Sequence, residues 1–139
     1  MIVLLSGFGS APPQDTYQVD RVYDGDTVRL TNGEKVRYIG IDTPEFGKEF
    51  EYFGKEAAQA NRRLVSGKRV RLEYDQELRD KYGRLLAYVY VDDIFVNAWL
   101  VENGYAQIMT IPPNVKYKDL FLKLRKEARE EGRGMWGKD

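Results

Sequence analysis

Residues 22–30 read VYDGDTVRL, a stretch that begins and ends like a β-strand but is interrupted by two aspartates flanking a glycine. Strand-forming residues also fill 17–23, and Asn32-Gly33 separates 28–30 from a further strand-like run at 36–39. An Asn-Gly pair between two such runs is a strong signal for a β-hairpin. This region therefore predicts a meander of about three strands, with two carboxylates at a turn.

The rest of the chain adds two more strands and three helices to the prediction. Strand-forming residues alternate over 70–74 and fill 85–91. The spacing of apolar residues predicts helices over 51–65 and 118–131, and Asn97 is expected to cap a short helix between them. This pattern predicts an α+β fold that is mainly β-barrel: a five-stranded OB-type barrel with three helices.

The composition excludes several kinds of chemistry. The 139 residues suffice for one domain, and the absence of Cys and His excludes disulfides, Cys/His zinc sites and catalysis by thiols or imidazoles. Because 22 Lys and Arg balance 22 Asp and Glu, any binding to nucleic acid must use local patches. No segment approaches the ~20 apolar residues that cross a bilayer, so we expect no membrane partner.

The N-terminal residues 1–16 differ from the rest of the chain. They are apolar, then small, then Pro-rich, and we expect either a disordered tail or the remnant of a signal peptide. The second possibility predicts a protein that is secreted or in the cell envelope. The domain itself is expected over residues 17–139, and the lack of a surplus amphipathic stripe favours a monomer.

Carboxylates and an arginine are expected on one rim of the barrel. A two-residue hairpin loop would place Val28 opposite Arg37, so that Asp26 and Arg37 become diagonal neighbours on one face. The next turn, residues 41–45, carries Asp42 and Glu45 back toward Asp26. Crowded carboxylates repel unless a cation neutralises them, and oxygen ligands favour Ca²⁺ or Mg²⁺ over zinc.

A second arginine, Arg84, lies in the loop sequence DKYGR at 80–84. Two arginines, a metal ion and a spare carboxylate suit phosphoryl transfer, because guanidinium groups clamp phosphate oxygens while the carboxylate positions a water. Each motif alone is more often a turn or a solvated strand face. Their joint occurrence favours the functional interpretation.

The segments VYDGDTVRL, VRYIGIDTPE and DKYGRLLAYVYV, with the closing EGRGMW, together resemble the staphylococcal nuclease (thermonuclease) family. The resemblance extends from about residue 17 to residue 136. It implies an OB barrel of the SNase type that hydrolyses single-stranded DNA and RNA with Ca²⁺. It further implies cleavage at the 5′ P–O bond, which leaves 3′-phosphate products.

The same resemblance implies a metal site. Asp26 and Asp42 are the expected carboxylate ligands of Ca²⁺, and Thr43 is expected to contribute its backbone carbonyl. The family gives Asp24 no direct role, so we expect Asp24 and Gly25 to shape the turn.

The catalytic and substrate-binding roles also follow from the resemblance. Glu45 would orient or deprotonate the attacking water. Arg37 and Arg84 would bind the phosphate and stabilise the transition state. Lys81 and Tyr82 match family positions that contact a terminal phosphate of the substrate.

Two departures from the family pattern concern substrate binding. Thr110 and Pro112 replace tyrosines of the base-binding wall. The loop FGKEFEYFGKE after Glu45 is shorter and more acidic than its lysine-rich counterpart, which predicts weaker electrostatic capture of a polyanion. Three aromatic residues of this loop have two possible roles: Phe46, Phe50 and Tyr52. They either provide an alternative surface for stacking on bases or pack under the helix that follows.

Two other functions stay open from sequence. One is a non-catalytic OB module that binds nucleic acid or protein, as degenerate repeats of the same family do. The other is a structural domain whose acidic rim binds Ca²⁺ for stability. The source of the proton for the leaving group also stays open.

Overall fold

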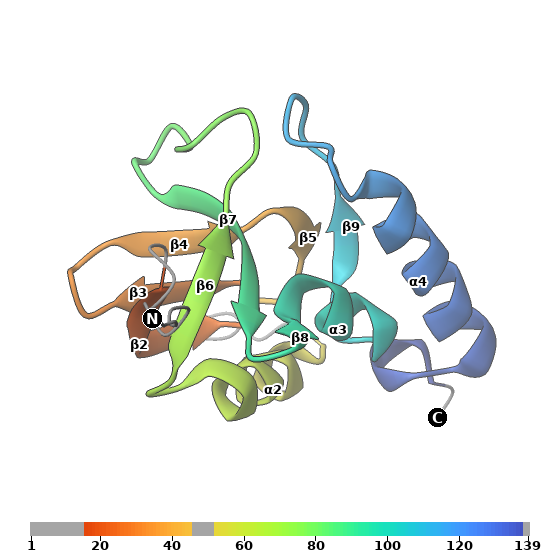
Figure 1. Cartoon of the computed structure of the whole chain (residues 1–139). Helices are drawn as coiled ribbons and strands as arrows, with labels where there is room; N and C mark the ends of the chain where they lie inside the picture. The colour runs from red at the N-terminus through yellow and green to blue at the C-terminus, as the bar shows by residue number, and fades with distance from the viewer. Residues whose placement is uncertain (1–15, 46–51, 138–139) are drawn as a thin grey trace, which may run out of the picture.

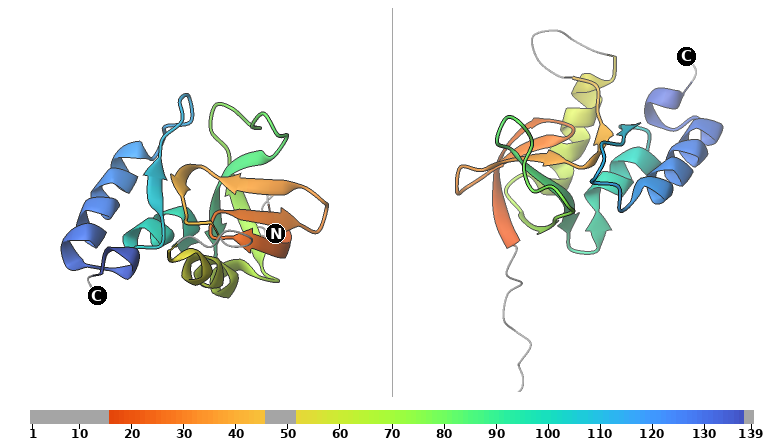
Figure 2. Two further views of the ribbon diagram at one scale, coloured as in Figure 1. Left: turned by 180° about the vertical axis from the view of Figure 1, so that it is seen from behind. Right: turned by 90° about the horizontal axis from the view of Figure 1, so that it is seen from above.

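The computed structural model describes residues 16–45 and 52–137, which form a closed β-barrel with helices packed at one end and side (Figures 1 and 2). Hydrogen bonding joins the strands in the order β4-β3-β2-β6-β7, and a parallel pairing of β4 with β7 closes the barrel. This confirms the predicted five-stranded barrel. Its strands are β2 (Thr16–Asp24), β3 (Thr27–Leu30), β4 (Lys35–Tyr38), β6 (Arg69–Glu73) and β7 (Leu85–Val91).

Three shorter strands extend the barrel. β8 (Ile94–Phe95) pairs with β7, and β5 (Gly40–Asp42) pairs antiparallel with β9 (Gln107–Met109). A kink separates β5 from β4, because Gly40 has a φ of 84°. Glycine is needed at this position, since a Cβ there would also lie 2.6 Å from the Phe121 ring. The β5–β9 pair was not predicted, since strands of three residues carry little periodic signal.

The described residues contain three α-helices, as predicted: α2 (Gly54–Val65), α3 (Val96–Glu102) and α4 (Lys118–Glu131). A short 3₁₀ turn, Gly134–Trp136, follows α4. In Figure 1, α2 lies below the barrel, and α4 lies on the side away from β2, β3 and β4. Phe121 and Ala128 bury the inner face of α4, whereas Leu120 stays 37% exposed.

The prediction that Asn97 caps α3 is wrong. The residue before the helix is Phe95, and Asn97 lies inside the helix, where it is fully buried. Its side-chain amide accepts a bond from Val89 N (2.9 Å) and donates to Ile39 O (2.9 Å). Asn97 therefore satisfies backbone groups of the barrel rather than those of its own helix.

The predicted hairpin register is also wrong, by one residue. Val28 lies opposite Val36, and Arg37 lies opposite Thr27. The loop has three residues, 31–33, because Gly33 adopts a φ of 91° and its N–H bonds to Leu30 O. A left-handed glycine at the third position is typical of three-residue hairpin loops.

Two expectations lie outside the described residues. The expected N-terminal tail comprises residues 1–16, and of these only Thr16, the first residue of β2, is described. Phe46 and Phe50, two of the aromatic residues considered as a stacking surface, fall within residues 46–51. Within the described ranges, no helix has the length and apolar character needed to cross a membrane.

Candidate active site

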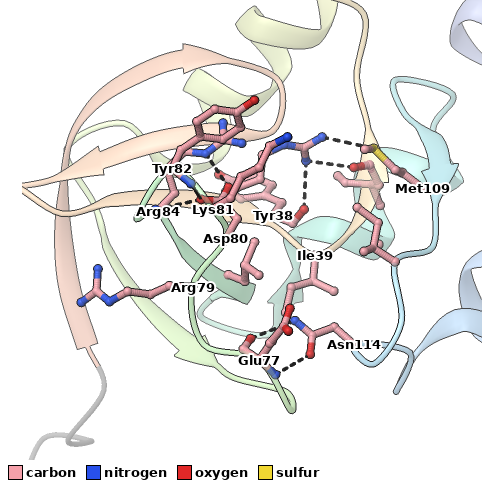
Figure 3. Close-up of a pocket in the computed structure, with 15 residues that line it drawn as sticks. Tyr38, Ile39, Glu77, Arg79, Asp80, Lys81, Tyr82, Arg84, Met109 and Asn114 are labelled. Carbon is pink, nitrogen blue, oxygen red and sulfur yellow. Dashed lines mark hydrogen bonds and ion pairs between the residues drawn. The ribbon is translucent and has the colours of Figure 1, made fainter.

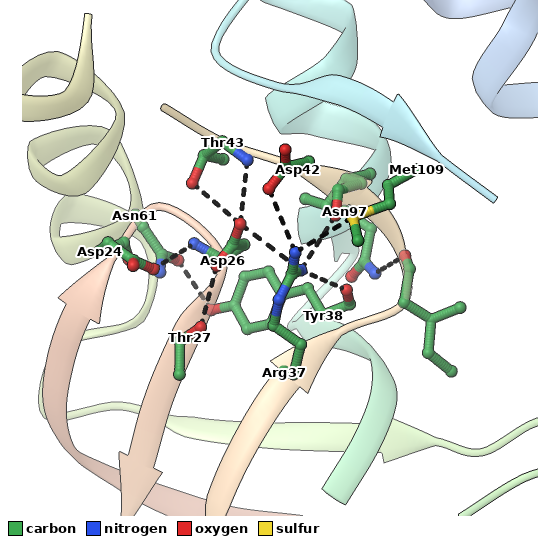
Figure 4. A network of polar contacts seen from close by, with 12 residues as sticks. Asp24, Asp26, Thr27, Arg37, Tyr38, Asp42, Thr43, Asn61, Asn97 and Met109 are labelled. Carbon is green, nitrogen blue, oxygen red and sulfur yellow. Dashed lines mark hydrogen bonds and ion pairs between the residues drawn. The ribbon is translucent and has the colours of Figure 1, made fainter. Parts of the chain in front are cut away.

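Arg37 is the centre of a polar network beside the turn between β2 and β3 (Figure 4). Its Nη1 donates to Tyr38 O (3.0 Å) and Ile41 O (2.9 Å), and lies 3.4 Å from Asp26 Oδ2. Its Nη2 lies 3.3 Å from Asp42 Oδ1. The side chain is only 14% exposed. Both predicted metal-binding carboxylates therefore contact one guanidinium group.

Asp26 is itself held by hydrogen bonds on both carboxylate oxygens. Its Oδ1 accepts from Thr27 Oγ1 (2.9 Å), and its Oδ2 accepts from Thr43 N (2.9 Å) and Thr43 Oγ1 (3.1 Å). Gly25 makes this approach possible, since a Cβ at that position would lie 2.7 Å from the Thr43 side chain. The Asp-Gly-Asp turn thus brings residue 26 against residue 43.

Asp24 shapes the same turn, as expected. Its Oδ1 accepts from Asp26 N (3.1 Å), and its backbone O accepts from Asn61 Nδ2 (3.0 Å). Asn61 Oδ1 in turn accepts from the buried Tyr38 hydroxyl (2.8 Å). Burial, together with the neighbouring Asp26 carboxylate, raises the pKa of Asp24 to about 7. The site therefore concentrates negative charge that a cation would relieve.

The donors at this site suit a hard cation. Asp26 and Asp42 present carboxylate oxygens to the same guanidinium group, Asp26 also contacts Thr43, and oxygen ligands are those that Ca²⁺ prefers. In the described part of the chain, however, no group of three or more Asp, Glu, His or Cys side chains gathers as a metal site. The expected convergence of Glu45 with the two aspartates is thus not found there, and Glu45 lies exposed.

Arg84 lies on the loop between β6 and β7 and is held within that loop. Its Nε donates to Asp80 Oδ2 (2.7 Å), while Asp80 Oδ1 accepts from the backbone N–H of Tyr82 (2.9 Å) and of Arg84 (3.0 Å). Burial alone would raise the pKa of Asp80, but these hydrogen bonds and the Arg84 charge hold it below its usual value. Tyr82 is 71% exposed, with Arg84 Cζ 5.4 Å and Lys81 Nζ 5.3 Å from its ring centre.

A cleft of about 750 Å³ lies between the β6–β7 loop and the segment after β9 (Figure 3). Four of the predicted residues line it: Arg37, Lys81, Tyr82 and Arg84. The remainder of its wall is largely aliphatic and includes Ile39, Ile41, Leu86, Met109 and Ile111. Arg37 therefore lies at the junction between the cleft and the two aspartates.

Some cleft residues were missed by the sequence prediction. Met109 Sδ accepts from Arg37 Nη2 at 3.6 Å, and Ile111 is 57% exposed at the rim. Thr110 and Pro112, which drew attention as departures from the family, do not belong to the cleft lining. Met109 is the last residue of β9, and the β5–β9 pairing that places it opposite Gly40 was not predicted from sequence.

The loop that carries Arg84 is anchored at both walls. Asn114 is buried, accepts from Glu77 N (2.8 Å) and donates to Glu77 O (2.9 Å). Arg79 makes a two-pronged contact with Glu34 of the β3–β4 hairpin, at 2.9 Å for each bond. These contacts set the width of the cleft.

Comparison with known proteins shows which family this chain resembles. The family model described as staphylococcal nuclease homologue matches residues 35–138. The thermonuclease of Staphylococcus intermedius is 41% identical over 128 residues, which cover 88% of this chain and 76% of that protein. The thermonuclease of Staphylococcus hyicus is 37% identical over 137 residues, covering 94% of this chain and 80% of that protein.

A relative from another genus is longer. The SPbeta prophage-derived endonuclease YokF of Bacillus subtilis is 43% identical over 129 residues, which cover 87% of this chain and 44% of that protein. This chain thus spans less than half the length of that relative. The match of the family model and the identities over most of the chain lead to one conclusion: the chain belongs to the staphylococcal nuclease family.

Proposed function

We propose that this protein is a Ca²⁺-dependent nuclease that hydrolyses phosphodiester bonds of single-stranded DNA and RNA. The observation that carries the proposal is the position of Arg37, which lines the cleft and also contacts Asp26 and Asp42. A phosphate bound by this arginine would lie beside a pair of carboxylates suited to a cation. The relatives named thermonuclease and endonuclease support the same activity.

In this proposal Asp26, Asp42 and the carbonyl of Thr43 hold Ca²⁺, which polarises a phosphate oxygen when bound. Mg²⁺ suits the site less well, because it requires near-octahedral geometry and releases its waters reluctantly. Arg37 then has two tasks: it offsets the charge of both carboxylates through its ion pairs and it binds the phosphate.

The remaining steps fall to side chains on either side of the phosphate. Glu45 orients or deprotonates the attacking water. Arg37 and Arg84 bind the equatorial oxygens and stabilise the transition state, so that the 5′ P–O bond breaks and a 3′-phosphate remains. Neither arginine protonates the leaving oxygen, because a guanidinium group is not deprotonated in proteins.

The cleft suits an unpaired nucleotide. Lys81 and Tyr82 bind a terminal phosphate at the rim. The aliphatic wall that includes Met109 and Ile111 accepts the base without hydrogen bonds to its edges, which predicts little discrimination among bases. As a working hypothesis, residues 17–139 form a monomeric nuclease domain that acts outside the cell or in the cell envelope.

The decisive experiment is a time course of digestion of heat-denatured DNA in millimolar Ca²⁺ and in excess chelator. Glu45→Gln tests the proposed site, and Glu130→Gln, on the outer surface of α4, is the matched control. We expect Ca²⁺-dependent digestion by the wild type and Glu130→Gln, and none by Glu45→Gln. A folded wild type that binds DNA without cutting it would support the non-catalytic module instead. Digestion by Glu45→Gln at the normal rate would contradict the role of Glu45.

A further inference from the structure

A row of three cations crosses the outer face of the barrel next to the candidate site. Arg21 of β2 lies opposite Arg29 of β3, and Arg29 lies opposite Lys35 of β4. Residues directly opposite one another share a face of the sheet, so three positive side chains lie side by side. Like charges in such pairs destabilise a sheet. Three cations in one row therefore cost stability unless other groups offset their repulsion.

An aromatic ring lies among these cations. Arg21 Cζ is 5.2 Å and Lys35 Nζ is 5.4 Å from the centre of the Tyr23 ring. Arg29 forms an ion pair with Asp20 at 2.7 Å, which offsets one of the three charges. Arg21 and Lys35 are exposed. Tyr23 is half-buried beside them, and cations grouped with an aromatic ring are typical of surfaces that bind single-stranded nucleic acid.

This surface is continuous with the candidate site. Lys35 and Arg37 are two residues apart on β4 and point to the same side of the sheet, about 6.6 Å apart along the strand. On this face of the hairpin, the pair that follows Arg29 and Lys35 is Thr27 with Arg37. The cation row therefore ends at Lys35, two residues along β4 from Arg37, the arginine that contacts both aspartates.

The cleft has room for only a small part of a polynucleotide. Its volume of about 750 Å³ is that of a site for one small ligand. OB folds that bind single strands cover about 4–16 nucleotides. A strand of that length therefore extends beyond the cleft.

We propose that Arg21, Tyr23, Arg29 and Lys35 form an outer track that binds the single-stranded substrate beyond the cleft. The cations contact backbone phosphates, and Tyr23 stacks on a base, so the track recognises single strands regardless of sequence. The proposal rests on the proposed function, because it assigns to the same substrate a second contact surface.

The test compares a long and a short ligand by fluorescence anisotropy in excess chelator, which prevents cleavage. The probes are labelled oligothymidylates of 12 and 2 nucleotides, and the variants are Arg21→Gln with Lys35→Gln, and Tyr23→Leu. The matched control is Lys123→Gln with Lys126→Gln, which removes two charges from α4 on the opposite side of the molecule (Figure 1). Circular dichroism and thermal melting verify that each variant folds.

The expected result is a loss that depends on ligand length. The Arg21/Lys35 double variant should bind the 12-nucleotide probe about tenfold more weakly near 0.15 M salt, with a salt slope shallower by about 1.4, since each lost phosphate contact removes about 0.7. Tyr23→Leu should weaken this binding about tenfold without changing the slope. Binding of the 2-nucleotide probe should be unchanged in all variants.

Other outcomes overturn the outer track. These are equal losses in the track and control variants, equal losses for both probes, or no binding of the long probe by the wild type. Variants that lose binding to phosphatidylserine vesicles but keep oligonucleotide binding would assign the surface to an anionic membrane instead. Digestion of heat-denatured DNA in Ca²⁺ is measured separately. Binding without digestion would overturn the nuclease and leave the track standing, whereas digestion with unaltered binding would do the reverse.

Discussion

The two arginines of the proposed active site, Arg37 and Arg84, are held in different ways. Arg37 is 14% exposed and takes its partners from both sides of the site: Asp26, Tyr38, Ile41, Asp42 and Met109. Arg84 is 29% exposed, and its described ion pair joins it to Asp80, four residues earlier in the same loop. Arg37 thus depends on the whole barrel for its position, while Arg84 depends on one loop.

This difference bears on what each arginine can contribute. A side chain fixed by several distant groups is already oriented before the phosphate arrives, so little ordering cost remains at the reaction. A side chain held within one loop has fewer distant groups to fix its orientation. We therefore expect Arg37 to be the less replaceable of the two.

The largest expected effect is that of Arg37→Lys. An ammonium group cannot reproduce the planar two-pronged contact, and the loss of one such transition-state interaction costs about 3 kcal/mol, or about a hundredfold in rate. The measurement is kcat for denatured DNA in Ca²⁺. A near-normal rate would refute the role assigned to Arg37.

Arg84→Lys is expected to lower kcat by about tenfold. The loop allows the lysine charge to approach the phosphate, although the fork geometry is lost. The same assay compares the two lysine variants directly. A loss as large as that of Arg37→Lys would show that the local anchoring of Arg84 by Asp80 is as effective as the wider network.

The charge accumulated on the Arg37 side predicts a stability effect for Asp24→Asn. The pKa of Asp24 is about 7 in the folded state against an ordinary 3.8, so the folded protein binds this proton more tightly. The stabilisation that comes from protonated Asp24 is complete below about pH 4 and is lost as the pH rises through about 7. Without Ca²⁺, Asp24→Asn should exceed the wild type in stability by on the order of 1 kcal/mol at pH 8, after allowance for solvent screening.

Urea denaturation at a series of pH values tests this expectation. The free energies of unfolding of the two proteins should converge near pH 4 and separate as the pH rises. Parallel curves would show that Asp24 does not titrate differently in the folded and unfolded states. The same stabilisation by substitution with asparagine is not expected for Asp80, on the Arg84 side of the cleft, because the pKa of Asp80 is lowered rather than raised.

The smallest effect is expected for Glu34→Gln, which breaks the contact with Arg79. Both side chains are substantially exposed, at 33% and 45%, and such surface pairs contribute little to stability. Urea denaturation and KM for denatured DNA should change little. A several-fold rise in KM would show that this pair, rather than Asn114, fixes the β6–β7 loop.

The sequence was sufficient for the barrel and for much of the candidate site. Strand-forming runs marked all five barrel strands, and two local motifs pointed to Arg37 and Arg84, two of the arginines that line the cleft. The carboxylates around Arg37 were expected together, and Asp26 and Asp42 are indeed joined by it. The metal, the reaction and the catalytic roles stay predictions.

The hairpin shows why the expected geometry was only partly right. Asn32-Gly33 indicated the turn, but loops of two and of three residues share that signal, and a shift of one residue changes every cross-strand pair. Asp26 and Arg37 nevertheless meet. Asp26 lies in the turn before β3, where its side chain is not bound by the alternation of the strand.

Tertiary structure alone decided the rest of the site. Asn97 and Asn61 bridge backbone and side-chain groups from distant elements, Met109 reaches Arg37 through the β5–β9 pair, and the cation row exists only in the observed register. Propensities and motifs act over a few neighbouring residues. Contacts between segments tens of residues apart depend instead on how the closed barrel satisfies its buried polar groups and packs its core.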